Sequence, residues 1–190
     1  IIHVAGLSRP MNTHERDINQ SIDKNIIGTC NIVKISSKYK IKLIFFSTNY
    51  VYPGVKGMYK ETDPLLPASN YAWSKLGAEA AVHMIKNSLI LRVCMTEKPF
   101  LHKYALSDVY LNFIFQEKIA NILPIILKRK GVINVGGPAQ TVYNFAKKSN
   151  PNVKKIKAKN VTKVQYKKNM SMSINKLLTI LKKNKKLLIN

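Results

Sequence analysis

Two residues four positions apart, Tyr71 and Lys75, have the side chains and the spacing for proton transfer. In a helix such residues project from one face, one turn apart. A free tyrosine titrates at about 10, and a nearby ammonium favours the phenolate and lowers that value. A tuned phenol beside a second hydroxyl suits carbonyl reduction or alcohol oxidation, because a proton moves at oxygen while hydride moves at carbon.

The second hydroxyl comes from Ser47 or Thr48, which follow the apolar run Ile44-Phe45-Phe46. That run predicts a short buried strand within 40–46. Open α/β sheets bind ligands outside the carboxyl ends of their strands, which is where this hydroxyl pair would lie. Tyr-x-x-x-Lys alone favours a surface pair, but with Ser-Thr about two dozen residues upstream the catalytic interpretation is favoured.

A helix over 71–86 must carry the Tyr-Lys pair. Ser69 or Asn70 can cap it. Its core-facing stripe is predicted from apolar residues at helical spacing, namely Ala72, Leu76, Ala80 and Met84.

The rest of the chain predicts an α/β fold. Strands are expected near 1–5, 41–46, 88–93 and 131–135, lying parallel in one sheet. One long helix is expected over 12–38, with an apolar stripe of Ile18, Ile22, Ile26, Cys30 and Val33. Three more helices are expected over 117–127, 141–148 and 172–181, the last followed by a solvated end at 182–186.

Composition indicates a soluble, cytoplasmic protein. Its 190 residues with 46% hydrophobic content suffice for a sizeable core. No apolar run reaches the roughly 18 residues of a membrane span, and no signal segment opens the chain. Cys30 and Cys94 are expected as reduced thiols. The four histidines are dispersed, so we expect no metal site.

The net charge is +23, and no acidic residue follows Glu117. A basic tail of this kind could bind nucleic acid or an anionic membrane. The lysines are scattered among Asn and Ile, as a bias toward A/T-rich codons would produce, and we expect no nucleic-acid partner. A basic binding module without turnover remains the alternative of a different class.

Three motifs together resemble the extended short-chain dehydrogenase/reductase family. They are Ser-Thr-x-Tyr-Val-Tyr at 47–52, Gly-x-Tyr-x-Glu-x-Asp-Pro at 57–64, and Tyr-x-x-Ser-Lys at 71–75. Within that family the chain is similar to dTDP-4-dehydrorhamnose reductases and the neighbouring sugar-nucleotide epimerases. The resemblance implies NAD(P)-dependent reduction of a nucleotide-linked 4-keto sugar in carbohydrate biosynthesis. It is also compatible with a homodimer.

The resemblance also implies a role for each site residue. Tyr71 would donate the proton, Thr48 would hold the substrate oxygen, and Lys75 would tune the phenol and grip the nicotinamide ribose. The cofactor, NAD or NADP, would be contacted by a larger set, comprising Ala5, Gly6, Asn25, Ser47, Tyr71, Lys75, Val93 and Cys94.

In this resemblance, residues 1–95 are the C-terminal half of a Rossmann domain, and 96–190 a mixed substrate-binding lobe with a basic tail. The phosphate-binding Gly-x-x-Gly-x-x-Gly that opens such enzymes does not occur in the chain. We therefore expect a fragment of a longer reductase, inactive on its own; the alternative is a stand-alone protein that has lost its cofactor half.

Three positions depart from the family pattern. Asn49 replaces the usual Asp of the reductases, Ala72 the Gly of Tyr-Gly-x-Ser-Lys, and Lys118 an Asp. Neither Asn49 nor Ala72 removes a catalytic group, but both leave the exact substrate open. An epimerase or dehydratase with the same triad is therefore the alternative within the family.

Overall fold

The computed structural model describes residues 1–161 and 167–183, so most of the expected solvated end at 182–186 lies outside the described residues. The chain forms two compact units. The first comprises Ile1–Tyr52, Pro64–Val93 and Leu127–Ile133, and the second comprises Pro53–Asp63, Cys94–Ile126 and Asn134–Asn190. Whether these units correspond to a cofactor-binding part and a substrate lobe stays a prediction.

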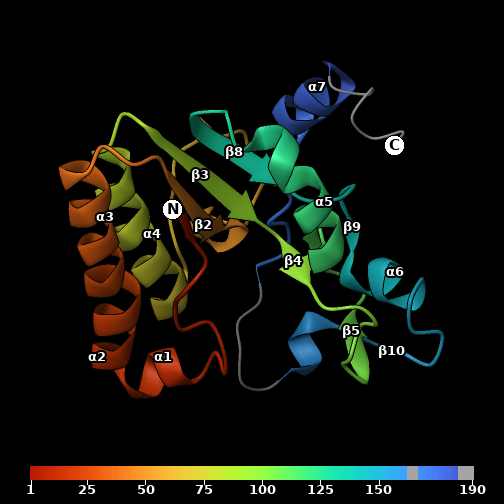
Figure 1. Cartoon of the computed structure of the whole chain (residues 1–190). Helices are drawn as coiled ribbons and strands as arrows, with labels where there is room; N and C mark the ends of the chain where they lie inside the picture. Colours follow the sequence, from red (N-terminus) through yellow and green to blue (C-terminus); the bar gives the residue numbers. More distant parts are fainter. Residues whose placement is uncertain (162–166, 184–190) are drawn as a thin grey trace. The chain divides into compact units, whose positions relative to one another are not determined.

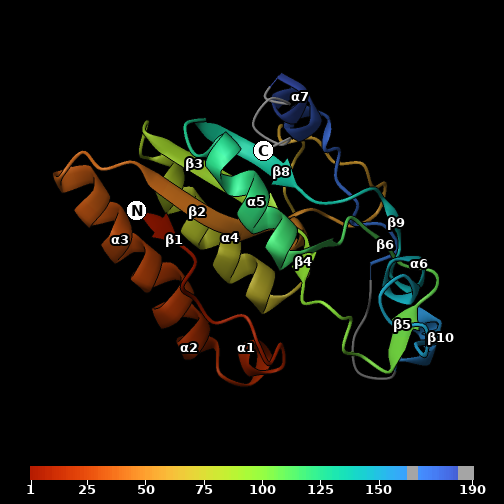
Figure 2. The ribbon, with the colours of Figure 1, turned by 45° about the vertical axis from the view of Figure 1, so that its right-hand side comes forward.

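The first unit is built on a four-stranded sheet with the strand order β1-β2-β3-β8, whose strands are all labelled in Figure 2 and seen from another side in Figure 1. Its strands are β1 (Ile2–His3), β2 (Leu43–Thr48), β3 (Ser88–Val93) and β8 (Gly131–Val135), the last two residues of β8 counting with the second unit. β1 and β2 pair in parallel, as do β2 and β3. All four lie where the sequence predicts strands.

β2 is longer than its apolar run predicts. Ser47 and Thr48 are its last two residues rather than residues that follow it. Thr48 is in register with Val93, the last residue of β3, so both lie at the carboxyl end of the sheet. The ladder continues because a β-branched threonine suits an extended backbone.

The prediction of a single helix over 12–38 is wrong in detail. The structure has α1 (Thr13–Arg16), then a continuous run of α2 (Ile18–Ser21), a π-helical segment (Ile22–Ile27) and α3 (Gly28–Lys38). Asp17 separates α1 from this run. Its backbone has φ −139° and ψ 88°, and its carboxylate accepts a hydrogen bond from the Gln20 N–H at 3.2 Å. A short acidic side chain caps a new helix well, which explains the break.

The π-helical segment also alters which side chains face inward. Its wider turn rotates the residues before it relative to those after it. Ile18 and Ile22, expected in the apolar stripe, are 54% and 37% exposed, whereas the polar Asn25 is buried. An apolar pattern taken at 3.6 residues per turn could not anticipate this rotation.

α4 (Asn70–His83) carries the Tyr-Lys pair and begins as predicted. Ser69 is its cap, because its hydroxyl accepts a hydrogen bond from the Ala72 N–H at 3.3 Å. The predicted stripe is wrong in part: Ala72 is buried, but Ala80 is exposed, and Met84, just beyond the helix, is 83% exposed. The buried face instead mixes apolar and polar residues, namely Ala72, Ser74, Lys75, Ala78, Glu79 and Val82.

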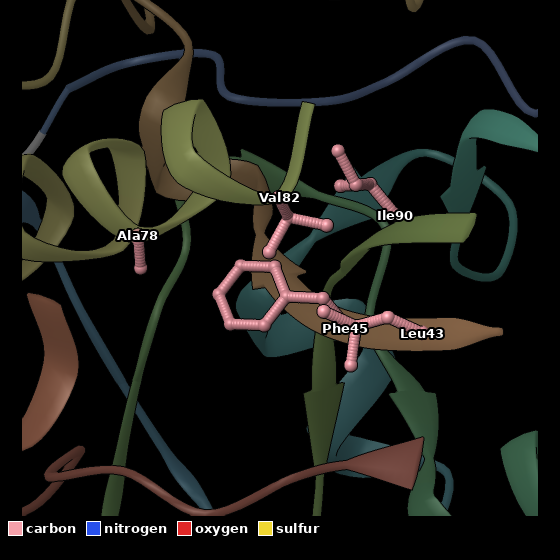
Figure 3. Packing of buried hydrophobic residues seen from close by; sticks show 5 residues of the cluster. All are labelled: Leu43, Phe45, Ala78, Val82 and Ile90. Carbon is pink, nitrogen blue, oxygen red and sulfur yellow. The ribbon is translucent and has the colours of Figure 1, made fainter. Parts of the chain in front are cut away.

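A tight cluster joins this helix to the sheet (Figure 3). Its fully packed members are Leu43, Phe45, Ala78, Val82 and Ile90. The partly buried Ile32 and Val33 of α3 pack against the same cluster. α3 and α4 therefore cover one face of the sheet, and they run side by side in Figures 1 and 2.

The second unit consists of short elements. Its strands are β4 (Met95–Thr96), β5 (Tyr104–Leu106), β6 (Tyr110–Leu111), β7 (Ile114–Phe115), β9 (Gln140–Thr141) and β10 (Lys154–Ile156), which pair as β4-β7, β5-β10 and β6-β9. Its helices are α5 (Gln116–Ile126), α6 (Val142–Lys147) and α7 (Asn175–Lys183). The three helices expected here are confirmed, although α7 begins three residues later than expected.

Two buried asparagines tie these short elements together. Asn134 donates through its amide to the carbonyl oxygens of Tyr59 at 2.9 Å and Ser173 at 3.3 Å. Asn112 donates to the carbonyl of Gly137 at 2.8 Å and accepts from the Met172 N–H. Buried amides of this kind replace the ladder bonds that such short strands lack. Among the described residues, no helix is long and apolar enough to cross a membrane.

Candidate active site

Tyr71 and Thr48 meet at the carboxyl end of β2. Tyr71 is in the first turn of α4, and its hydroxyl is hydrogen-bonded to the side chain of Thr48, the last residue of the strand. The ring of Tyr50 packs edge-on to that of Tyr71, with 6.2 Å between centroids. The structure therefore brings together the two hydroxyls that the sequence placed on different elements.

The pKa of Tyr71 is raised above its ordinary value, contrary to the expectation that it is lowered. Burial is the largest cause, because it disfavours the charged phenolate. The hydrogen bond with Thr48 and the positive charge of Arg9 lower the pKa in part. Arg9, which no motif singled out, thus contributes the cation that acts on this phenol.

Lys75 lies one turn further along α4 and is buried. Its Nζ is 4.2 Å from the centroid of the Phe45 ring, a cation–π contact. Burial lowers the pKa of Lys75 to about 8, while the charge of Glu79 raises it. His3 is affected in turn, because its own burial and then the charge of Lys75 lower its pKa.

One turn beyond Lys75 on α4, Glu79 forms a buried ion pair that no sequence motif had indicated. Glu79 of α4 accepts from Arg92 of β3, with 2.5 Å from Nη2 and 3.1 Å from Nε to Oε1. Its second oxygen accepts from the Ser47 hydroxyl at 2.6 Å, and Arg92 donates to the Tyr52 hydroxyl at 2.8 Å. The Ser47 hydroxyl, expected to contact the cofactor, is therefore engaged by a carboxylate.

A signal for this ion pair was present in the sequence. Tyr71, Lys75 and Glu79 follow each other at intervals of four, so the carboxylate shares their helix face. Arg92 is the one charged residue in the apolar strand Ser88–Val93. A charged residue inside an apolar strand needs a buried partner, and Glu79 provides it.

Asn25 braces the site from within the π-helical segment. Its amide donates to the carbonyl of Leu7 at 2.9 Å and to the Ser74 hydroxyl at 2.8 Å, and its oxygen accepts from the Leu7 N–H at 2.7 Å. The Ser74 hydroxyl in turn donates to the carbonyl of Tyr71 at 2.8 Å. Asn25 thereby links the loop after β1 to the backbone of the tyrosine.

The remaining predicted cofactor residues differ in their surroundings. Ala5 and Gly6 are exposed just beyond β1, and a Cβ at Gly6 would be 2.9 Å from Oδ1 of Asn25. Val93 is buried next to Thr48 on the neighbouring strand. Cys94 belongs to the second unit, where burial raises the pKa of its thiol to about 12.

Within residues 1–161 and 167–183, no three His, Cys, Asp or Glu side chains gather where they could hold a metal ion. The polar groups nearest Tyr71 and Lys75 are hydroxyls, the Asn25 amide, the cation of Arg9 and one buried ion pair. This set is suited to moving a proton at an oxygen and to binding hydroxyl groups.

Comparison with known proteins gives a family and a fold. Residues 1–96 match the family model described as RmlD substrate binding domain. Methionine adenosyltransferase 2 subunit beta from Pongo abelii is 28% identical over an alignment of 127 residues, and the match covers 64% of this chain and 37% of that protein. The chain thus spans well under two thirds of this curated relative's length.

Solved structures of low identity share the architecture. A hypothetical dTDP-4-dehydrorhamnose reductase from Sulfolobus tokodaii matches with a TM-score of 0.83 at 22% identity, covering 95% of this chain and 73% of that one. The dTDP-4-dehydrorhamnose reductase from Bacillus anthracis, solved in complex with NADP, matches with a TM-score of 0.74 at 21% identity, covering 94% and 72%. These likenesses show a Rossmann-like α/β fold.

Proposed function

The chain belongs to the RmlD substrate binding domain family, and on that premise we propose that it carries the proton-transfer residues of an NAD(P)-dependent reductase. The substrate class is a nucleotide-linked 4-keto sugar. The observation that carries the proposal is the hydrogen bond between Tyr71 and Thr48 at the carboxyl end of the sheet, with Lys75 one turn away. The names of the two reductases of similar fold support the same substrate class.

Each residue of the site has one task in this proposal. Tyr71 gives its proton to the C4 oxygen of the sugar. The high pKa of Tyr71 keeps the phenol protonated at neutral pH, which is the form an acid needs. Thr48 holds the phenol and the same substrate oxygen by hydrogen bonds.

Lys75 fits a ribose of the dinucleotide. Its buried ammonium lies over the Phe45 ring, and hydroxyl groups would accept the hydrogen bonds that a ring face cannot fully replace. Tyr71 would share this ribose contact. The dinucleotide supplies the hydride when bound. The other residues proposed to line the dinucleotide site are Ala5, Gly6, Asn25, Ser47 and Val93, all of the first unit.

The test is a turnover assay on the longer reductase of which the chain is expected to be a fragment, with NADH or NADPH and a panel of 4-keto nucleotide sugars that includes dTDP-4-dehydrorhamnose. Tyr71→Phe removes the proton donor but keeps the ring. We expect turnover to fall roughly 10²- to 10⁴-fold with little change in substrate binding. Tyr104→Phe, at an exposed tyrosine of the second unit, is the matched control. A Tyr71→Phe protein as fast as wild type would refute the assignment.

The same assay separates the rival functions. An epimerase or dehydratase would change the sugar without net oxidation of NADH or NADPH. A basic binding module would show no turnover, and its affinity for nucleic acid would fall steeply with salt.

A further inference from the structure

His14, on the short helix α1, is a buried residue with no place in the site described so far. It is 0% exposed, and its Nδ1 is 2.7 Å from the Ser21 hydroxyl oxygen. Its Nε2 is buried and has no hydrogen-bond partner among the described residues. A buried polar atom without a partner is costly and uncommon in native structures, so its surroundings call for an explanation.

The imidazole of His14 packs against the phenol of Tyr71. Their ring centroids are 5.1 Å apart and the planes are inclined by 59°. Tyr50 contacts the same phenol at 6.2 Å. The Tyr71 ring is thus in contact with two other rings, and its hydroxyl is held by Thr48.

The same short helix also holds the start of α4. The Glu15 carboxylate accepts from the Asn70 N–H at 3.1 Å and from the Asn70 side-chain amide at 2.8 Å. That amide donates to the carbonyl of His14 as well, at 3.2 Å. Asn70 directly precedes Tyr71, so His14 and Glu15 hold the backbone next to the tyrosine, and His14 also contacts its ring.

We propose that His14 is a positioning residue for Tyr71 and that it performs this role only as a neutral imidazole. The inference rests on the proposed function of Tyr71 as the proton donor. The Ser21 hydroxyl fixes the orientation of the imidazole, the imidazole packs against the phenol, and the phenol is kept dry and aligned with Thr48.

The requirement that the imidazole be neutral, here called the charge condition, follows from the hydrogen bonds. Both nitrogens of the protonated ring carry an N–H, and Nε2 makes no hydrogen bond to the described residues. Burial is the main cause that lowers the pKa of His14, and the charge of Glu15 and the backbone of Ser8 raise it in part. The other charged or titratable groups on the flanking segments are Arg9, Arg16, Asp17 and Tyr71.

The sign of the pH effect is therefore fixed. We call α1 docked when His14 is packed against Tyr71, and released when it is not. Because the pKa of His14 is lowered in the docked state, released His14 binds the proton more readily than docked His14. Docking of α1 is at full strength above the ordinary value of 6.5 and weakens as the pH falls below it. We expect the acid side of the activity profile to carry this dependence.

The first experiment needs no turnover. The phenol pKa of Tyr71 is measured by NMR on the chain with ¹³C-labelled tyrosine, the signal being assigned with Tyr71→Phe. We expect His14→Ala to let water reach the phenol and to move the pKa down toward the ordinary value of 10.0. His14→Phe, which keeps a ring, should retain the raised value. His102→Ala, at an exposed histidine, should leave it unchanged.

The second experiment uses the turnover assay. His14→Ala should lower kcat roughly 10- to 100-fold with little change in the KM for the sugar, because a misplaced acid affects the reaction more than binding. His14→Phe should keep most of the rate and lose the decline below pH 6.5. If His14→Phe does not fold, Ser21→Ala releases the ring while the imidazole remains, and a partial fall in kcat is expected.

The outcomes separate this inference from the proposed function. Full activity of Tyr71→Phe would refute the function, whatever His14 does. An inactive Tyr71→Phe together with a His14→Ala protein of wild-type kcat and unchanged Tyr71 pKa would refute the role of His14 alone. A His14→Phe protein with the wild-type acid decline would refute the charge condition.

Discussion

Replacing Glu79 by Gln should destabilise the first unit by about 3–5 kcal/mol, the usual cost of removing one partner from a buried ion pair. The carboxylate is 0% exposed and accepts three hydrogen bonds within 3.1 Å, two from Arg92 and one from Ser47. Gln has one acceptor oxygen and turns an NH₂ group toward its donors. Arg92, which is 3% exposed, would be left as an uncompensated buried cation.

The pKa of Glu79 gives a second route to the magnitude. Burial raises this pKa, but hydrogen bonds from His83, Arg92 and Ser47 and the charge of Arg92 outweigh it and hold the value at about 2, against 4.5 ordinarily. At roughly 1.4 kcal/mol per unit, this shift corresponds to about 3 kcal/mol. Because the folded pKa is lowered, this stability is present above pH 4.5 and is lost as the pH falls toward 2.

The assay is urea unfolding followed by the fluorescence of Trp73, the single tryptophan, which is on α4 itself. Wild type and Glu79→Gln are compared at pH 7 and at steps down to pH 3, with Glu117→Gln at an exposed position as the control. The difference in the free energy of unfolding between wild type and Glu79→Gln should become smaller as the pH falls below 4.5.

A double variant distinguishes a paired network from simple packing. Glu79→Leu with Arg92→Leu removes both charges and should recover much of the loss, because apolar replacements of buried ion pairs are often neutral or stabilising. A Glu79→Gln protein within 1 kcal/mol of wild type at pH 7, or a gap that does not depend on pH, would refute this reasoning.

Four further changes test other parts of the site. In the longer reductase, Lys75→Met should weaken dinucleotide binding in calorimetry, and the wild-type amine of the chain should titrate near pH 8 by NMR. Thr48→Val should lower turnover less than Tyr71→Phe, because it leaves the acid in place; the reverse order would count against these roles. Asn25→Leu should cost roughly 1–3 kcal/mol in urea unfolding for each buried group left unpaired. Ser69→Ala should cost about 1 kcal/mol through the lost helix cap, and an unchanged midpoint would contradict it.

Much of the fold could be predicted from the sequence, because strand and helix patterns are local. The four strands of the first unit, the cap at Ser69 and the helices of the second unit depend on residues close together in the chain. The resemblance to extended short-chain reductases is confirmed at the level of the family, since the matched region, residues 1–96, contains all three motifs. The roles of individual site residues stay predictions.

Tyr71 and Lys75 could be found from the sequence for the same reason. Residues four apart in a helix share a face whatever the rest of the chain does. Thr48 could be placed at a strand end from the apolar run before it. What the sequence determined was thus the chemistry of the site and the element that carries each group.

Only the tertiary structure decided which groups act on one another. The bond from Asn25 to Ser74 joins residues 49 positions apart, that from Arg92 to Tyr52 spans 40, and that from Ser47 to Glu79 spans 32. Such contacts depend on how helices dock on the sheet, and the π-helical turn that buries Asn25 leaves no apolar pattern. The pKa of Tyr71 rises for the same reason, because burial belongs to the packed unit and not to the spacing of two residues.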